Sequence, residues 1–211
     1  YKIRSKIEIK DLSPNYVVGV INFENFKIIQ KYLDKQEMTL QYRDSPIFVD
    51  PRDSELGARI ISPLEKLYLT IKKLNLKIVQ NNSYIEKAFL KGIPVEGLNN
   101  LQNQLFGLEV NFEKLNAIDF KKGCYVGQEN TARIKLKNKL SKRLFPIKLI
   151  EGKLNEDEKI YNNNIEIGKV LINDEYPFAL IKYLDENFDK NLVYKVDKSM
   201  FKIIIPPWLK I

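Results

Sequence analysis

The chain contains no histidine and a single cysteine, Cys124. Its own residues therefore cannot build a Ser-His-Asp or Cys-His catalytic arrangement. One thiol cannot form an internal disulfide, and structural zinc sites need several cysteine or histidine ligands. These absences exclude the common nucleophilic hydrolases and zinc proteins, and they fit a reducing compartment.

Long hydrophobic runs are missing as well. The longest apolar runs, 16–21 and 203–208, have the length of a strand, whereas a membrane-spanning helix needs about 20 apolar residues. We therefore expect no membrane association and a cytoplasmic location, or the mitochondrial matrix in a eukaryote. The chain begins at Tyr1 without methionine, on a segment that reads as a linker, so we expect the N-terminal part of the fold to be missing.

The net charge of +8 is concentrated in one stretch. Residues 121–148 contain nine basic residues and one acidic residue, so the rest of the chain sums to zero. Such a stretch could meet an anionic partner or could be a solvated basic surface, and the sequence leaves both open. Aromatic residues that stack on bases are absent between residues 126 and 144, so we expect no direct nucleic-acid binding.

The first part of the chain mixes strand and helix patterns. Short apolar runs predict strands, whereas apolar residues spaced three and four apart predict helices. The predicted strands lie at 7–9, 16–21 and twice within 45–62, and the predicted helices lie at 63–74 and 82–94. Residues 25–34 fit either a helix or a loop with one turn, and residues 95–120 are expected to be mostly loop.

The second part of the chain predicts an antiparallel barrel. A short helix should follow Cys124, and a half-buried strand with outward lysines should begin at Ile134. Further short strands are predicted at 143–150, 159–171, 177–184, 191–196 and 201–205, separated by turn residues. We therefore predict an α+β region over residues 1–138 and a C-terminal β-barrel over residues 139–211.

The segment "KKGCYVGQENTAR", residues 121–133, places the cysteine between two glycines and ahead of the predicted helix. Free N–H groups at a helix start and nearby cations favour the thiolate over the thiol. Lys121, Lys122 and Arg133 supply cations. Glu129 stands four residues before Arg133, a spacing at which side chains pair on a helix. The pattern therefore indicates a reactive Cys124 on a basic surface.

A structural explanation exists for each of these residues, and spacing alone leaves it open. A lone cysteine is most often a small buried apolar residue. Gly123 and Gly127 could serve only the turn, and Tyr125 could simply pack. The pair on the helix could stabilise that helix and nothing more.

The motif "KGCYVGQE", followed by Ala132 and Arg133, resembles the signature of the YgfZ/IBA57 family. This family of folate-binding-type proteins is related to the glycine cleavage T-protein, an aminomethyltransferase. Three other segments are similar to the family: "FLKGIPVEG" at 89–97, "LEVN" at 108–111 and, more weakly, "FVDPRDSELGARII" at 48–61. The strong resemblance covers residues 89–149, and a looser one spans the chain.

The resemblance implies an α+β fold of the aminomethyltransferase type, with a mixed folate-binding domain followed by a small antiparallel barrel. It implies support for the assembly or repair of iron–sulfur clusters in client enzymes, including tRNA-modifying enzymes, with Cys124 as the functional thiol. It further implies tetrahydrofolate or a derivative as the cofactor, and no metal site. The expected folate-binding residues are Glu109, Asn111, Lys122, Gly123, Tyr125, Gly127, Gln128, Glu129 and Arg133.

The expected partners are iron–sulfur client or assembly proteins, and the chain is expected to be a monomer and not a conventional enzyme. The alternative is a tetrahydrofolate-dependent aminomethyltransferase resembling the T-protein, which would not need Cys124. We expect Glu109 to bind the pterin, because a carboxylate can accept two parallel N–H bonds from the amino-pyrimidine edge. The other explanation for Glu109 is an ion pair with a surface lysine.

Overall fold

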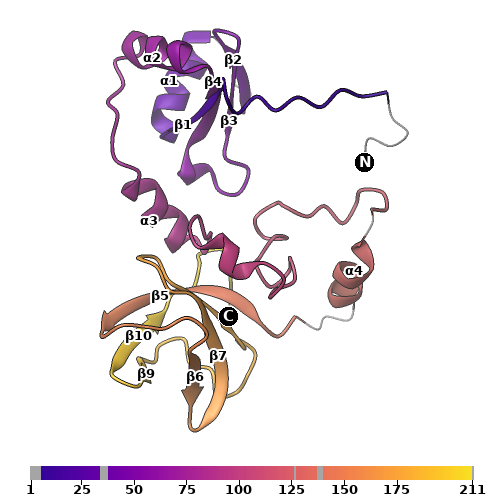
Figure 1. The fold of residues 1–211 in the computed structure, drawn as a ribbon, viewed down its shortest axis with the longest axis vertical. Coiled ribbons are helices and arrows are strands. Elements are labelled where there is room, and N and C mark those ends of the chain that lie inside the picture. Colours follow the sequence, from indigo (N-terminus) through magenta and orange to yellow (C-terminus); the bar gives the residue numbers. More distant parts are fainter. Residues whose placement is uncertain (1–5, 34–37, 126, 137–139, 211) are drawn as a thin grey trace. The chain divides into compact units, whose positions relative to one another are not determined.

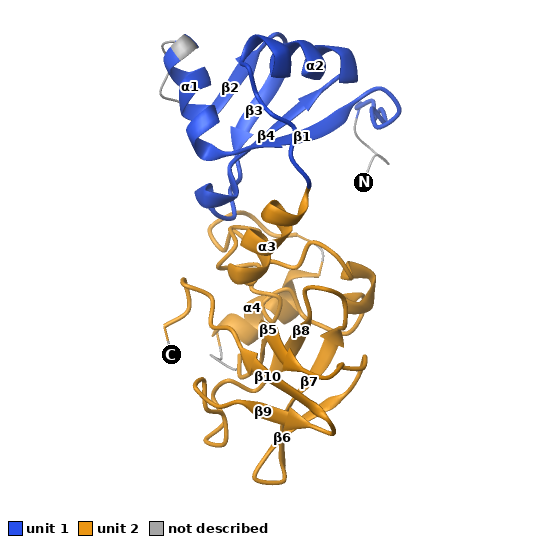
Figure 2. Ribbon diagram, turned by 90° about the vertical axis from the view of Figure 1, so that its left-hand side faces the viewer, with its two compact units in different colours: residues 1–80 blue, residues 81–211 orange. Residues whose placement is uncertain are grey.

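A computed structural model of the chain describes residues 6–33, 38–125, 127–136 and 140–210 (Figure 1). The chain divides into two compact units, residues 1–80 and 81–211 (Figure 2), and each is described by itself. Residues 81–136 therefore group with the barrel strands. The domain boundary predicted between residues 138 and 139 lies outside the described residues and stays a prediction.

The first unit is a four-stranded antiparallel sheet with two helices, and its strand order is β1–β4–β3–β2. Its elements are β1 (Val17–Ile21), α1 (Phe23–Leu33), β2 (Thr39–Tyr42), β3 (Ser45–Val49), the 3₁₀ helix η1 (Ser54–Leu56), β4 (Ala58–Ser62) and α2 (Leu64–Lys73). Phe26 and Ile29 of α1 and Leu67 of α2 join the apolar cluster formed by the sheet. The predicted strands at 16–21 and within 45–62 and the helix at 63–74 are confirmed, and residues 25–33 lie in α1.

The strand predicted at 7–9 is wrong. Residues 6–12 are exposed and have no regular secondary structure, with Ile7 48% and Ile9 71% exposed. An extended segment becomes a strand only when a neighbour satisfies its backbone N–H and C=O groups. Residues 7–9 pair with none of the described strands, so apolar alternation alone was not sufficient.

A buried carboxylate organises the connection between β3 and β4. Asp50 is 3% exposed and accepts hydrogen bonds from Nε and Nη2 of Arg52, at 3.0 and 2.8 Å, and from Nη2 of Arg59, at 3.1 Å. Gly57 closes the same connection with φ +89°, and a side chain there would meet the Ile21 carbonyl oxygen at 2.1 Å. The segment "DPR" therefore supplies the buried carboxylate and one of its two arginine partners, and Gly57 supplies the positive φ in the same connection.

The second unit begins with α3 (Asn82–Leu90) and the 3₁₀ helix η2 (Leu98–Leu101). The helix predicted within 82–94 is confirmed. Gly92 follows α3 with φ +72°, and a side chain there would meet Pro206 at 2.6 Å. The indole N–H of Trp208 donates to the Lys91 carbonyl over 2.8 Å, so the C-terminal segment packs on the end of α3.

Six antiparallel strands form the rest of the second unit in the order β6–β7–β8–β5–β10–β9. They are β5 (Arg143–Glu151), β6 (Lys159–Asn162), β7 (Ile165–Ile172), β8 (Phe178–Ile181), β9 (Tyr194–Val196) and β10 (Ser199–Ile203). The outer strands β6 and β9 also approach each other, so the sheet is a nearly closed barrel around Phe145, Tyr194 and Phe201. The predicted barrel is confirmed.

The helix α4 (Gln128–Leu136) precedes the barrel. The half-buried strand predicted from Ile134 is therefore wrong up to residue 136, and residues 137–139 lie outside the described residues. Ala132 and the lysine, leucine and arginine residues, none of which is β-branched, have high helix propensity. The apolar alternation was too short to distinguish a strand from the last turn of a helix.

Candidate functional site

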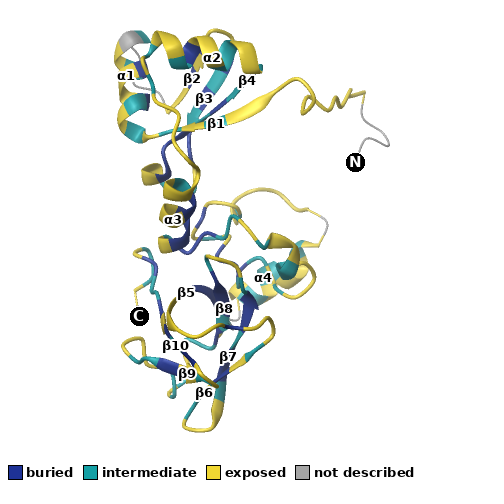
Figure 3. Cartoon of the chain, turned by 60° about the vertical axis from the view of Figure 1, so that its left-hand side comes forward, coloured by how far each residue is buried: buried dark blue, intermediate teal, exposed yellow. Residues whose placement is uncertain are grey.

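The cysteine motif lies on the surface of the second unit, where Cys124 is exposed. Residues 119–125 are all exposed, and Figure 3 shows this segment leading into α4. The helix begins at Gln128, four residues after the thiol rather than directly after it. The explanation of Cys124 as a small buried residue is therefore excluded by its exposure.

A reciprocal pair of hydrogen bonds fixes the turn between Cys124 and α4. The backbone N–H of Tyr125 donates to Oε1 of Gln128 over 3.2 Å, and the N–H of Gln128 donates to the Tyr125 carbonyl over 3.3 Å. The first of these bonds resembles one half of a capping box, in which a Glu or Gln side chain accepts a backbone N–H ahead of the helix. Gln128 thereby holds the residue next to Cys124.

The two glycines of the motif differ in their structural need. Gly127 has φ +88°, a conformation that residues with a side chain rarely adopt, so the turn requires a glycine there. Gly123 has no such φ, and a Cβ atom at Gly123 would meet no atom of the described residues within 4 Å. Packing within the chain does not explain Gly123, which leaves open space beside the thiol.

Basic and aromatic side chains surround this turn. The ammonium group of Lys122 lies over the Tyr125 ring, 4.8 Å from its centroid. The backbone N–H of Lys121 donates to Oδ1 of Asp119 over 2.8 Å, which shapes the approach to the thiol. Lys121 and Lys122, which the sequence predicted to lie near Cys124, are thus exposed in the loop that carries Cys124.

The helix α4 is tied to the preceding loop through Lys135. Its ammonium group pairs with the Glu113 carboxylate and lies 5.4 Å from the centroid of the Phe120 ring. Glu129 and Arg133 are exposed on the same helix, and the described side chains show no ion pair between them. The i,i+4 pairing expected from the sequence is therefore not part of this arrangement.

Asn111 holds the "LEVN" segment to the barrel. Its side chain is fully buried, its amide N–H donates to the Leu144 carbonyl over 3.0 Å, and its Oδ1 accepts from Nη1 of Arg143 over 2.9 Å. The backbone of Asn111 has φ +65°, which asparagine tolerates better than most residues. Both halves of its amide are used inside the unit.

Glu109 lies in the same segment and is partly buried. Its Oε2 accepts the backbone N–H of Phe106 over 2.9 Å, and its backbone carbonyl accepts the N–H of Leu144 over 2.8 Å. No ion pair of Glu109 with a lysine is present among the described side chains. The geometry brings Glu109 and Asn111 together at the entry to β5, and Lys122, Tyr125 and Gln128 together around Cys124.

Sequence reasoning did not identify Arg143 as structural. It counted Arg143 among the surface charges of residues 121–148, but the side chain is only 7% exposed, and its guanidinium lies 5.6 Å from the centroid of the Tyr183 ring. The only sequence feature that indicated a buried side chain was the position of Arg143 at the start of an apolar predicted strand. Its partner Asn111 is 32 residues away in sequence.

Metal-binding clusters and membrane-spanning helices are both absent from the described residues. No three Asp, Glu, Cys or His side chains are grouped so that they could hold a metal ion. No helix in that part of the chain combines the length and apolar character that crossing a bilayer requires. A single cysteine is thus the only thiol ligand that the sequence offers.

Comparison with curated proteins finds mitochondrial iron–sulfur cluster assembly factors that are similar in sequence to this chain. The chain is 33% identical over 150 residues to the mitochondrial iron–sulfur cluster assembly factor IBA57 homolog of Dictyostelium discoideum, a match that covers 70% of this chain and 36% of the relative. It is 32% identical over 156 residues to the Neurospora crassa homolog, covering 69% and 33% of the two chains. It is 30% identical over 156 residues to the Mus musculus protein, covering 73% and 41%.

The curated homologues of this chain are IBA57 iron–sulfur cluster assembly factors. The resemblance predicted from the cysteine motif is confirmed. The chain spans between 33% and 41% of the length of these IBA57 relatives. No family model matches the chain.

Comparison with solved structures supports the predicted fold class. The chain is similar to the glycine cleavage system aminomethyltransferase T of Bartonella henselae with a TM-score of 0.55 and 12% sequence identity. The likeness covers 86% of this chain and 56% of that structure. The aminomethyltransferase-like α+β fold is therefore confirmed.

Proposed function

We propose that this chain supports the assembly or repair of iron–sulfur clusters in client enzymes, including tRNA-modifying enzymes, and that Cys124 is its functional thiol. The observation that carries the proposal is the exposed thiol beside the open space at Gly123. Homology to IBA57 factors supports the same assignment. The partners of the chain would then be iron–sulfur client or assembly proteins.

The chemistry of a lone cysteine limits what it can do with a cluster. Iron–sulfur clusters are commonly held by four cysteine thiolates, and this chain has one. Cys124 can therefore donate one bond to an iron atom, while the remaining ligands must come from a partner or from the cluster's donor. Such a contact suits transient handling of a cluster better than permanent storage.

A complementation experiment tests the role of the thiol. The chain is expressed in cells that lack their own IBA57 factor, and the activity of an iron–sulfur enzyme is measured against that of an enzyme without a cluster. The unaltered chain should restore the cluster enzyme, and Cys124→Ala should not. Ser141→Ala changes another small exposed side chain of the same unit and is the matched control. Equal restoration by Cys124→Ala would remove the thiol from the function.

Binding of tetrahydrofolate is the second part of the proposal. Its support is the resemblance of the motif and of the "LEVN" segment to the YgfZ/IBA57 family. Glu109 is assigned to the pterin, because Oε2 holds one backbone N–H and Oε1 has no recorded donor among the described residues. Asn111 acts by positioning, since both halves of its amide are used in internal hydrogen bonds, and Gln128 positions the turn through its Oε1. Lys122, Gly123, Tyr125, Gly127, Glu129 and Arg133 would border the ligand.

Calorimetric titration with tetrahydrofolate tests this part separately. Wild-type chain should bind, and Glu109→Gln should bind more weakly because a charged acceptor becomes neutral. Glu113→Gln, a nearby acid paired with Lys135, is the control. Binding that is unchanged in Glu109→Gln removes this residue from the site, and absence of binding by the full-length wild-type protein removes folate.

A tetrahydrofolate-dependent aminomethyltransferase is the alternative function, favoured by the fold likeness to aminomethyltransferase T. It requires no thiol, so aminomethyl transfer retained in Cys124→Ala would support it.

The curated relatives are mitochondrial proteins, and we propose the same compartment, or the cytoplasm in a cell without mitochondria. A monomeric chain is proposed, with sedimentation as its test.

A further inference from the structure

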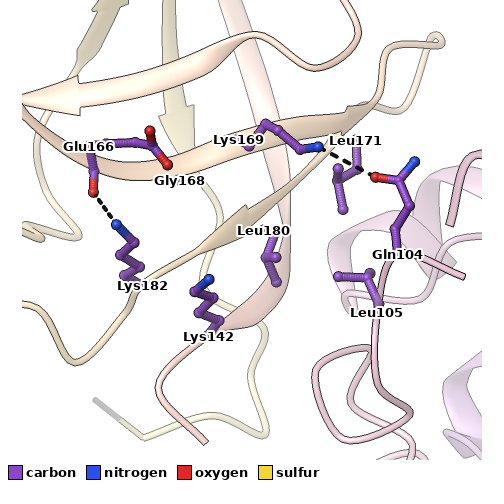
Figure 4. A pocket seen from close by; sticks show the side chains of 9 residues that line it. All are labelled: Gln104, Leu105, Lys142, Glu166, Gly168, Lys169, Leu171, Leu180 and Lys182. Carbon is purple, nitrogen blue, oxygen red and sulfur yellow. Dashed lines mark hydrogen bonds between the residues drawn. The ribbon is translucent and has the colours of Figure 1, made fainter.

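A second feature of the barrel unit is a cavity of about 230 Å³ outside the cysteine loop (Figure 4). It opens between β7, β8, the residue before β5 and the segment after η2. Its lining combines the apolar side chains of Leu171 and Leu180 with the charged side chains of Lys142, Lys169, Lys182 and Glu166. Three lysines and one glutamate thus share the cavity with apolar groups.

The charged groups of the cavity are only partly in water, since all four residues are partly buried. Removing an ammonium group from water raises its free energy unless a hydrogen bond or an opposite charge replaces the solvent. The cations that lack such replacement therefore decide what the cavity attracts.

Two of the charges are already compensated. Lys169 pairs with Oδ1 of Asp157 at 2.5 Å and lies 3.4 Å from Oε1 of Gln104. The Glu166 carboxylate pairs with Nζ of Lys159 at 2.8 Å. That hydrogen bond lowers the pKa of Glu166 despite partial desolvation, and the charges of Lys159, Lys182 and Lys142 act in the same direction. Glu166 is therefore ionised at neutral pH, but its charge is shared with Lys159.

Lys142 and Lys182 are compensated least. Lys182 donates to the backbone carbonyl of Glu166 over 2.7 Å, which carries no full charge. Lys142 has no recorded acceptor among the described residues, and in Figure 4 both side chains extend toward β7. Their surplus positive charge is turned into the cavity.

Strand register places these two lysines opposite each other. Arg143 pairs with Ile181 at the end of the antiparallel ladder of β5 and β8, and Lys142 and Lys182 are the residues just beyond that end, one before β5 and one after β8. Continuing the same alignment by one residue sets the two lysines across from each other, and like charges in that arrangement repel. The phenolic O–H of Tyr183 donates to the Leu140 carbonyl over 3.2 Å and helps to hold the two segments together. An anion between the two ammonium groups would relieve their repulsion.

We propose that this cavity binds a small organic anion, with a carboxylate or phosphate group between Lys142 and Lys182 and an apolar body on Leu171 and Leu180. Each ammonium group has free N–H donors for charge-assisted hydrogen bonds to oxygen. The size of the cavity suits a body of a few carbon atoms. The site uses none of the residues assigned to the thiol or to folate.

Nuclear magnetic resonance titration of the ¹⁵N-labelled chain tests the proposal with three probes: hexanoate, hexyl phosphate and neutral hexanol. Hexanoate or hexyl phosphate should shift the backbone amides of Gly168, Lys169 and Lys182 in a saturable way, with Kd of about 1 mM. Hexanol should bind at least about tenfold more weakly, because it lacks the charge. The tighter of the two anions identifies the head group.

Two substitutions separate the cavity from general surface charge. Lys142→Gln should weaken anion binding about tenfold or more, and the fold should survive because this side chain has no recorded internal hydrogen bond. Lys202→Gln, an exposed lysine on β10 outside the cavity, should leave affinity unchanged. Equal weakening by both variants, equal binding of hexanol, or no saturable shift with either anion up to about 20 mM overturns the proposal.

Discussion

Arg143 and Asn111 hold each other in the interior of the second unit through a 2.9 Å hydrogen bond from Nη1 to Oδ1. Arg143 carries a positive charge at the first position of β5, and no carboxylate pairs with it among the described residues. Its Nε lacks an acceptor in that part of the chain, so Asn111 and the Tyr183 ring provide its main compensation. The segment that carries Glu109 is thereby fixed to the barrel.

Asn111→Ala should destabilise the second unit by about 2–4 kcal/mol. The substitution removes two buried hydrogen bonds, leaves the Arg143 guanidinium and the Leu144 carbonyl less satisfied, and places alanine at φ +65°. Urea unfolding followed by circular dichroism measures the change. Asn103→Ala is the control, because Asn103 also has a positive φ, +61°, but is exposed. A loss of equal size in Asn103→Ala would show that backbone conformation, and not the buried pair, dominates.

The first unit should lose stability in acid through Asp50. Burial alone would raise the pKa of this carboxyl, but hydrogen bonds from Arg52 and the charges of Arg52 and Arg59 outweigh burial and lower it. An unfolded aspartate titrates near pH 3.9, roughly. Since the folded pKa lies below that value, the stabilisation is complete above about pH 4 and is lost as the pH falls through the folded pKa.

Asp50→Asn tests that assignment by removing the titrating group. The variant should be less stable at pH 7 by about 3 kcal/mol or more, because two arginines lose a buried anionic partner. Its stability should also fall less steeply than that of the wild type below about pH 4. Asp44→Asn removes an exposed partner of Lys66 and should change little. An acid profile of Asp50→Asn that parallels the wild type would contradict the role of Asp50.

Most of the barrel could be predicted from the sequence because its strands are short runs rich in apolar residues, separated by turn residues. The strand at 7–9 and the strand from Ile134 were wrong because their alternation is as short as one turn of a helix or a few residues of loop. Local patterns of that length do not include the pairing partner, which decides whether an extended segment becomes a strand.

The candidate site was located from its motif, but its internal contacts could not be predicted. Gln128, which the resemblance assigns to folate, also bonds to the Tyr125 backbone through Oε1, a contact visible only once the helix start is known. Arg143 and Asn111 meet only because β5 folds back on the "LEVN" segment. Lys142 precedes β5 and Lys182 follows β8, so their juxtaposition depends on the register of the ladder between those strands.

The exposed position of Cys124 predicts that its thiol contributes little to folding. Cys124→Ala should leave the free energy of unfolding within about 0.5 kcal/mol of the wild type, because an exposed side chain gives up little buried area. Urea unfolding checks this value. Iodoacetamide should label the native chain completely under conditions in which it labels the urea-unfolded chain. A native thiol that stays unlabelled would mean that the loop covers it in solution.

Gln128 should be needed to hold the turn beside that thiol. In Gln128→Ala the side-chain acceptor is lost, so the Tyr125 N–H should exchange with solvent deuterium faster than in the wild type. Gln128→Glu keeps an acceptor in the same place and should preserve slow exchange, since a glutamate side chain can also accept a backbone N–H ahead of a helix. Thr131→Ala, a change on the same helix away from this contact, is the control. Amide exchange at Tyr125 that is equal in all three variants would show that the turn is held by its backbone alone, and Gln128 would then be free for the ligand assigned to it from the motif.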